Sequence, residues 1–138
     1  MDIMKSFEFF LNRNDIQYQK KDNSISFAYD NKNFLLLLDS KDPNYYRLTL
    51  PKVGVGNIEK NELNNILIRL TSEYKVGKTV DTIDEGIWFS YEQLLMSEKT
   101  EDCEYVFSRS IAVLSEMLKS YREMMQELIN TAHINDAP

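Results

Sequence analysis

The chain is poor in the residues that most often carry chemistry. Among its 138 residues there is one cysteine, Cys103, and one histidine, His133. A single cysteine excludes an internal disulfide and suits a reducing compartment. A lone histidine in a predicted terminal tail argues against a Ser-His-Asp or Cys-His site, because the base of such a site needs a fixed orientation. We therefore expect no catalytic residues in this chain.

Positive charge and long apolar runs are also scarce. The chain has 16 Lys and Arg against 22 Asp and Glu, a net charge of -6 and a pI of about 4.8. This balance argues against nucleic-acid phosphates or an anionic membrane as partners. No run approaches the ~20 apolar residues that a membrane span requires, and the N-terminus lacks the pattern of a signal peptide. We expect a cytoplasmic protein that binds neither nucleic acid nor membrane.

The acidic residues do not form a recognisable metal site. Several lie in or beside predicted loops, namely Asp39, Asp42, Asp81, Asp84 and Glu85, where solvated turn acids are common. None fits a calcium-binding EF-hand loop, and no histidine or cysteine stands near them to bind zinc. Cys103 lies near a predicted helix N-terminus, which lowers a thiol pKa, but the acidic residues around it act in the opposite direction. We expect a structural cysteine, no metal and no cofactor.

The stretch Ser24–Leu50 is the part of the chain around which we expect the fold to be built. It predicts three antiparallel strands. Asp30-Asn31 fits a two-residue hairpin turn between the first two, because both residue types tolerate positive φ. The turn sets a register that pairs Tyr29 with Lys32, Phe27 with Phe34, and Ile25 with Leu36.

Paired residues share a face of the sheet, so this register sorts the stretch into two faces. The face expected to meet the core holds Ile25, Phe27, Tyr29, Phe34, Leu36, Leu38, Tyr46, Leu48 and Leu50. The opposite face is half polar, yet Leu35 and Leu37 lie in its middle, beside Tyr45. Two interpretations stay open: neighbouring side chains shade these leucines, or a partner covers them.

Hydrophobic periodicity predicts the remaining elements. Helical spacing indicates helices over residues 2–13, 58–74 and 100–129, and alternation indicates strands over residues 78–83 and 87–94. Residues 16–19 fit a short strand or a lead-in, and residues 130–138 fit a flexible tail. The prediction is one α+β domain over residues 1–138, with a single antiparallel five-stranded sheet, helices packed on it and the order α-β-β-β-α-β-β-α.

Two further features indicate contact surfaces. Trp88 falls on the partly polar face if its neighbours Ile87 and Phe89 face the core, and aromatic residues are enriched in interface hot spots. The last helix would be roughly 45 Å long, whereas strands of this size reach only about 20 Å. Unless that helix bends or packs on another helix of the chain, part of its apolar stripe is left over. We expect this part to form a homodimer interface through Leu118, Tyr121, Met125 and Leu128.

The run Gly54-Val55-Gly56 precedes a predicted helix, and the N-terminal amides of helices bind anions. It lacks the Gly-Lys-Ser/Thr ending of a P-loop and the third glycine of a dinucleotide site. A flexible connection with Asn57 as N-cap is the more common structure. The loop still supplies an alternative function, a small-molecule or nucleotide binder or a cryptic enzyme with a pocket near Gly54–Asn57.

A resemblance to a known fold rests on four stretches: FLNRNDIQYQ, ISFAYDNKNFLLLLDSKDPNYYRLTLP, ELNNILIRLTSEYKVGKTVD and IWFSYEQLL. In this order, in a small acidic chain, they look like the type III secretion chaperone-like fold, including the YbjN family. The resemblance covers nearly the whole chain. It implies a homodimer, no catalytic residues, and either the binding of an extended client segment on apolar surface or the regulatory role suggested for YbjN-like members.

These observations favour a non-enzymatic protein-interaction module, chaperone-like or regulatory, that binds a partner segment on a partly apolar sheet face. The residues predicted to contact the partner protein or peptide are Leu35, Leu37, Tyr45 and Trp88.

Overall fold

The computed structural model describes residues 2–54, 58–74, 77–82 and 86–136. Three helices and six strands follow one another along the chain. Their bounds are α1 (Ile3–Arg13), β1 (Tyr18–Lys21), β2 (Ser24–Tyr29), β3 (Lys32–Leu37), β4 (Tyr45–Val53), α2 (Lys60–Glu73), β5 (Gly77–Thr82), β6 (Gly86–Leu94) and α3 (Thr100–Asp136).

All six strands belong to one antiparallel sheet in the order β1-β2-β3-β4-β6-β5. The predicted α+β class is confirmed, with six strands in place of five. The additional strand is β1, in the region where the sequence fitted either a short strand or a lead-in. It is a real strand because its four residues pair with β2 along the edge of the sheet.

The β2–β3 hairpin has the predicted turn and register. Asp30 and Asn31 have φ of 50° and 60°, the left-handed conformation that a two-residue turn of this type needs. Phe27 pairs with Phe34 and Ile25 with Leu36. The rings of Phe27 and Phe34 stack on the core side, with their centroids 5.2 Å apart. Local turn chemistry therefore decides which side chains of this hairpin enter the core.

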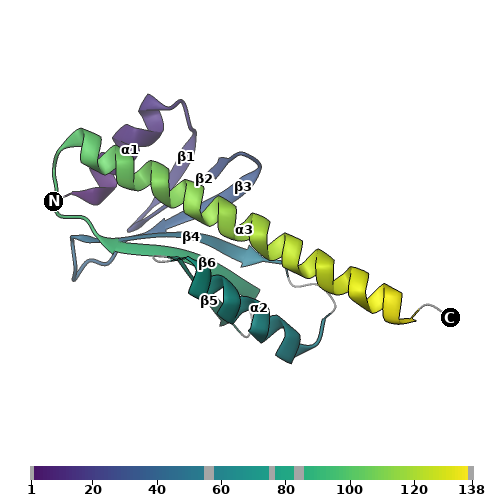
Figure 1. Cartoon of the computed structure of the whole chain (residues 1–138). Coiled ribbons are helices and arrows are strands. Elements are labelled where there is room, and N and C mark those ends of the chain that lie inside the picture. Colours follow the sequence, from purple (N-terminus) through teal and green to yellow (C-terminus); the bar gives the residue numbers. More distant parts are fainter. Residues whose placement is uncertain (1, 55–57, 75–76, 83–85, 137–138) are drawn as a thin grey trace.

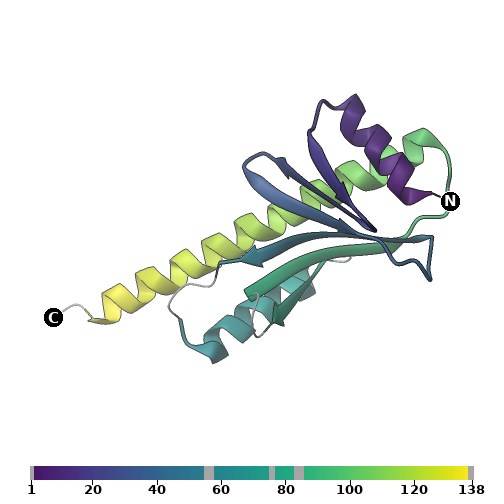
Figure 2. The same cartoon turned by 180° about the vertical axis from the view of Figure 1, so that it is seen from behind.

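The helices cover one face of the sheet, and in the part of the chain that the structure describes no helix lies on the other. In Figure 1, α3 runs in front of the strands, and in the reversed view of Figure 2 the strands lie in front of α3. The buried apolar residues form one cluster, to which the covered face of the sheet and all three helices contribute. The C-terminal end of α3 extends past the sheet in both views.

The centre of this core is aromatic and is organised around Phe7 of α1. The Phe7 ring, which is fully buried, lies 4.9 Å from the ring of Phe107 and 5.6 Å from that of Phe27 between centroids. It also lies 6.2 Å from the ring of Tyr46. The Tyr46 hydroxyl is satisfied by the Ser110 hydroxyl at 2.7 Å, so this polar atom is buried at low cost. Phe7 thus joins α1, the sheet and α3.

Three expectations about local structure were wrong. Tyr29 is 48% exposed although alternation along the strand places it on the core face. It is exposed because it lies at the end of the hairpin. The last helix does not stop at Ile129 but continues to Asp136, since neither glycine nor proline occurs between these positions. The N-cap of α2 is Glu59, without a side-chain capping bond, and the predicted cap Asn57 lies outside the described residues.

We predict that Phe7→Ala destabilises the protein by about 3–5 kcal/mol, because it leaves a cavity among aromatic rings that cannot close it. The measurement is the free energy of unfolding from urea denaturation followed by circular dichroism. Phe9→Ala is the matched control, since Phe9 lies on the same helix but is 56% exposed. This control is expected to change stability by less than about 1 kcal/mol. Equal losses from the two variants would show that Phe7 is not central.

Candidate functional site

The candidate site is the face of the sheet that carries no helix, which we call the open face. The strand registers place Leu35, Thr49, Ser90 and Lys78 side by side across β3, β4, β6 and β5. Arg47 and Glu92 are paired in the neighbouring row. The structure therefore brings the four predicted partner-contact residues, Leu35, Leu37, Tyr45 and Trp88, onto one face.

These four side chains are partly exposed, so they are neither fully shaded nor free in solvent. Leu94 extends their apolar surface, because it pairs with Tyr45 and is 60% exposed. Between them lie two small polar residues, Thr49 and Ser90, which are buried although no helix covers them. The Thr49 hydroxyl donates to the carbonyl of Leu35 at 2.9 Å. Larger side chains around this centre close it from solvent.

A polar cluster lies beside the apolar residues and is centred on Glu92 of β6. Its carboxylate accepts a hydrogen bond from Ser90 Oγ at 3.2 Å and forms an ion pair with Lys78 Nζ. The hydroxyl of Tyr45 donates to the same carboxylate. The side chain of Glu92 is only 15% exposed, so these donors replace water that the sheet excludes.

The surroundings of Glu92 shift its acidity in opposing directions. Burial alone would raise the pKa of Glu92, because it penalises the charged form. The hydrogen bonds from Lys78 and Tyr45, the Lys78 charge and the Ser90 hydroxyl outweigh burial, so the pKa lies below the ordinary 4.5. Burial, followed by the hydrogen bond to Glu92, raises the pKa of Tyr45. Both groups therefore remain in one protonation state near neutrality.

Two donors on the open face lack an acceptor. Arg47 Nε and Trp88 Nε1 are buried atoms with no hydrogen-bond partner in the structure. Arg47 also forms no ion pair with the described residues, because the adjacent Glu92 is taken by Lys78, Tyr45 and Ser90. Alternation along the strand puts Arg47 on the same face as Tyr45, but the sequence pattern by itself indicates no role for it. Only the register and the contacts of Glu92 show that this cation is unpaired.

Three of the four residues predicted to form a dimer interface are not available at the surface. Leu118, Tyr121 and Met125 are 6%, 2% and 7% exposed, so their own protomer already buries them. Tyr121 packs its ring against Phe89 and donates its hydroxyl to the carbonyl of Gly54. The expectation that the sheet could not shelter these three residues was wrong, because α2 and the sheet together extend the core beneath α3. Leu128 is partly buried and packs at the edge of that core.

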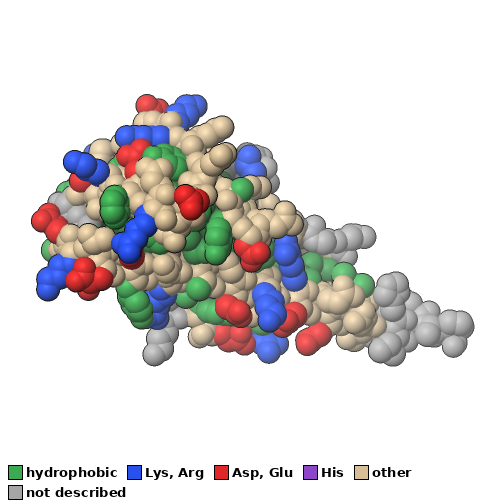
Figure 3. Space-filling view, turned by 90° about the horizontal axis from the view of Figure 1, so that it is seen from above, with side chains coloured by type: hydrophobic (Ala, Val, Ile, Leu, Met, Phe, Trp, Pro, Cys, Tyr) green, Lys and Arg blue, Asp and Glu red, His purple; other side chains and the backbone are tan. Residues whose placement is uncertain are grey.

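The side of the molecule seen in Figure 3 shows no continuous apolar surface. Hydrophobic side chains appear there as separate spots between acidic and basic ones. Charged residues also join α1 to α3, as in the 2.9 Å ion pair between Arg13 and Glu104. Scattered apolar residues of this kind are ordinary for a protein surface.

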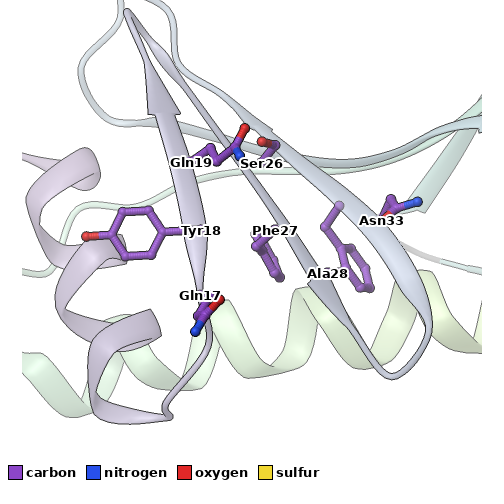
Figure 4. Close-up of a pocket in the computed structure, with 8 residues that line it drawn as sticks. Gln17, Tyr18, Gln19, Ser26, Phe27, Ala28 and Asn33 are labelled. Carbon is purple, nitrogen blue, oxygen red and sulfur yellow. The ribbon is translucent and has the colours of Figure 1, made fainter.

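The cavity with the most side-chain amides in its lining does not provide the groups that acid–base catalysis needs. This open cavity of about 430 Å³ lies at the β1–β2–β3 end of the sheet and is shown in Figure 4. Gln17, Gln19 and Asn33 contribute carboxamides to it, and the hydroxyl of Tyr18 points away to Glu8 of α1. Uncharged amides can bind a neutral ligand but supply no general base at neutral pH.

A second cavity, of about 270 Å³, lies between α1 and the start of α3 and includes Cys103. The thiol is buried and donates to the carbonyl of Ser97 at 3.4 Å. Burial, then the charges of Asp102 and Glu98, raise the pKa of Cys103. This cysteine has the structural role that the sequence predicted, because a raised pKa reduces the reactive thiolate.

The remaining predictions concern metals and the glycine loop. Among residues 2–54, 58–74, 77–82 and 86–136, no three histidine, cysteine or acidic side chains come together as metal ligands. Residues 55–57, the centre of the proposed anion loop, lie outside the described residues, as do Asp84 and Glu85. In the part of the chain that is described, no helix is long and apolar enough to cross a membrane.

The described residues define a fold class: a six-stranded antiparallel sheet with three helices on one face and none on the other. No family model matches the sequence, and no curated protein matches it. The structure is similar to the crystal structure of YbjN, "a putative transcription regulator from E. coli". The TM-score is 0.67 at 11% sequence identity, and the match covers 83% of this chain and 87% of that chain. The chain therefore has a YbjN-like fold, as its element order predicted.

We predict that Glu92→Gln reduces the loss of folding stability that the protein shows as the pH is lowered. Because the folded-state pKa is lowered, the charged Glu92 stabilises the fold above its unfolded-state pKa of about 4.5. This contribution is lost as pH falls through the folded-state pKa. Melting temperatures between about pH 2.5 and 7 test this, with the exposed Glu123→Gln of α3 as control. A Glu92→Gln curve parallel to that of the wild type would contradict the prediction.

Proposed function

We propose that this chain is a non-enzymatic protein-interaction module, chaperone-like or regulatory, that acts in the cytoplasm and binds a segment of a partner on the open face. The observation that carries the proposal is the one-sided placement of the helices. It leaves Leu35 and Leu37 of β3, Tyr45 of β4 and Trp88 of β6 on three adjacent strands, and no helix of the described residues lies above them. An exposed sheet face of this kind is where another chain can bury apolar surface.

The contact would be of moderate strength. Two leucines and two aromatic residues offer a few hundred Å² of partly exposed surface, and burial yields about 25 cal/mol per Å² before ordering costs are subtracted. The aromatic residues Tyr45 and Trp88 are suited to act as anchors, because they bring a large area at a small loss of side-chain entropy. The face thus suits an extended segment better than a large rigid surface.

Two observations support a non-enzymatic role. The partly exposed acid on the open face, Glu92, is held ionised by its three donors and so is unsuited to take up protons near neutrality. The described thiol, Cys103, is buried with a raised pKa. The description of YbjN as a regulator concerns that protein. A regulatory role for this chain would use the same open face to bind its partner.

We predict that Leu35→Ser combined with Leu37→Ser leaves the fold intact but reduces peptide binding by about tenfold or more, because apolar contact area is lost. The measurement is fluorescence anisotropy with peptides selected on an array of short extended sequences. Ile68→Ser on α2 is the matched control, since Ile68 is 66% exposed away from the open face. Unfolding of the double variant, seen by circular dichroism, would show that the two leucines belong to the core.

We also propose that the chain forms a homodimer through the projecting end of α3 and not through its buried middle. A groove of about 310 Å³ runs between α2 and this end, and Ile66, Met124 and Leu128 contribute its apolar lining. Ile129, one residue further on, is 38% exposed. A second copy could cover this end of α3, because the helix extends past the sheet (Figure 2).

We predict a dimer by light scattering at micromolar concentration, and a monomer for Ile129→Glu, because the charge would be desolvated at the contact. Ile68→Glu is the control on the far side of α2 and is expected to remain dimeric. A monomeric wild type, or a dimer that survives Ile129→Glu, would contradict this proposal without affecting the open face.

A further inference from the structure

The open face differs in charge from the rest of the protein. Among strand residues whose registers place them on this face, Lys21, Arg47 and Lys78 are cationic and Glu92 is the one described anion. The whole chain has the opposite balance, with a net charge of -6. The strand residues of the open face therefore carry more positive than negative charge in an acidic protein, while the loop carboxylate of Asp42 lies near enough to Tyr45 to raise its pKa.

Arg47 is the cation on this face that most needs a partner. Lys78 is neutralised by Glu92, and Lys21 lies in exposed β1 at the edge of the sheet. Arg47 is partly buried in the middle, and its Nε is shut off from water without an acceptor. Burying part of a guanidinium without a counter-charge is unfavourable, and an incoming carboxylate would remove that cost through a charge-assisted hydrogen bond.

The two groups on the open face that lack a hydrogen-bond partner are of the same kind. Arg47 Nε and Trp88 Nε1 are both donors, and no buried side-chain acceptor of the described residues is left without a partner. A ligand that completes this face must therefore bring acceptors. An acidic side chain near Arg47 and the backbone carbonyls of an extended segment have that property.

We propose that the open face binds an extended protein segment in which apolar residues and one carboxylate side chain point toward the sheet, and that Arg47 binds the carboxylate. This inference rests on the proposed function and adds the chemistry of the partner. The apolar residues of the segment contact Trp88 and Leu35. The carboxylate selects among apolar segments that would otherwise bind equally well.

The strand registers set the spacing that such a segment needs. Trp88 and Glu92 are separated by four residues along β6, and Arg47 is paired with Glu92. At ~3.3 Å per residue, Trp88 therefore lies about 13 Å from the row of Arg47. Side chains of an extended segment alternate, so the residue above Trp88 and the carboxylate at Arg47 are four positions apart, with a third inward residue between them.

The test uses labelled synthetic peptides of about seven residues with two leucines at alternate positions, a third inward position that carries Glu, Gln or Lys, and serine elsewhere. Each peptide is made in both sequence directions. We expect the Glu peptide to bind about tenfold more tightly than the Gln peptide, and the Lys peptide more weakly than both. The protein's net charge of -6 opposes the Glu peptide, so a preference for it must arise from local contacts. Moving Glu by one position should remove the preference.

Arg47→Met keeps the apolar stem of the side chain and removes the charge. It is expected to equalise binding of the Glu and Gln peptides while leaving the melting temperature unchanged or higher, because a partly buried unpaired charge is lost. Arg47→Lys should retain part of the preference for Glu. Arg122→Met on the exposed surface of α3 is the matched control and should retain all of it. If Arg47→Met does not fold, Arg47→Lys and the salt dependence of the wild type still test whether Arg47 binds the carboxylate. Added salt should weaken binding of the Glu peptide more than binding of the Gln peptide.

The outcomes separate this inference from the proposed function. Equal binding of Glu and Gln peptides, lost in the Leu35→Ser/Leu37→Ser variant, would overturn the carboxylate partner but keep the binding face. No binding of any peptide at about 1 mM would overturn both. Arg47-dependent binding of a duplex of about 20 base pairs, not displaced by the Glu peptide, would assign the positive surface to nucleic acid instead.

Discussion

The packing of three helices against a single face of one sheet is the constraint on which the rest of this structure depends. The buried aromatic cluster in which Phe7 joins α1 to β2, β4 and α3 holds two of these helices on that face. Leu63, Leu67 and Leu70 of α2 join the same core. Because every helix is engaged on that side, the strands in the middle of the sheet must present their second face to solvent or to another molecule. The proposed binding surface is therefore a consequence of how the core is closed.

The open face combines two kinds of surface that favour different partners when they occur separately. Apolar residues alone would bind many segments with little discrimination, and positive charges alone would bind many anions. Here Leu35 and Leu37 lie next to Arg47, and the neighbouring Glu92 is occupied by its own donors. This arrangement leaves a cation that is available to a partner within an apolar setting, which is a physical basis for selectivity.

The middle of α3 shows that the length of a helix relative to the strands does not predict which of its apolar residues are exposed. A helix longer than the strands it crosses suggests surplus apolar area, yet Leu118, Tyr121 and Met125 are buried within one protomer. The length of the helix relative to the strands leaves out α2, which packs beside α3 and adds Leu63, Leu67 and Leu70 to the same core. Contacts between helices distant in sequence are not encoded in the periodicity of either helix.

Local patterns determined much of this protein without any coordinates. Alternation and the Asp30-Asn31 turn set the hairpin register, the inward face and the α+β class, because these depend on neighbours along the chain or across a short turn. The tertiary structure decided which cation of the open face pairs with Glu92. That Lys78 takes Glu92 and leaves Arg47 unpaired depends on β5 and β4 flanking β6, a proximity that arises only when the sheet assembles.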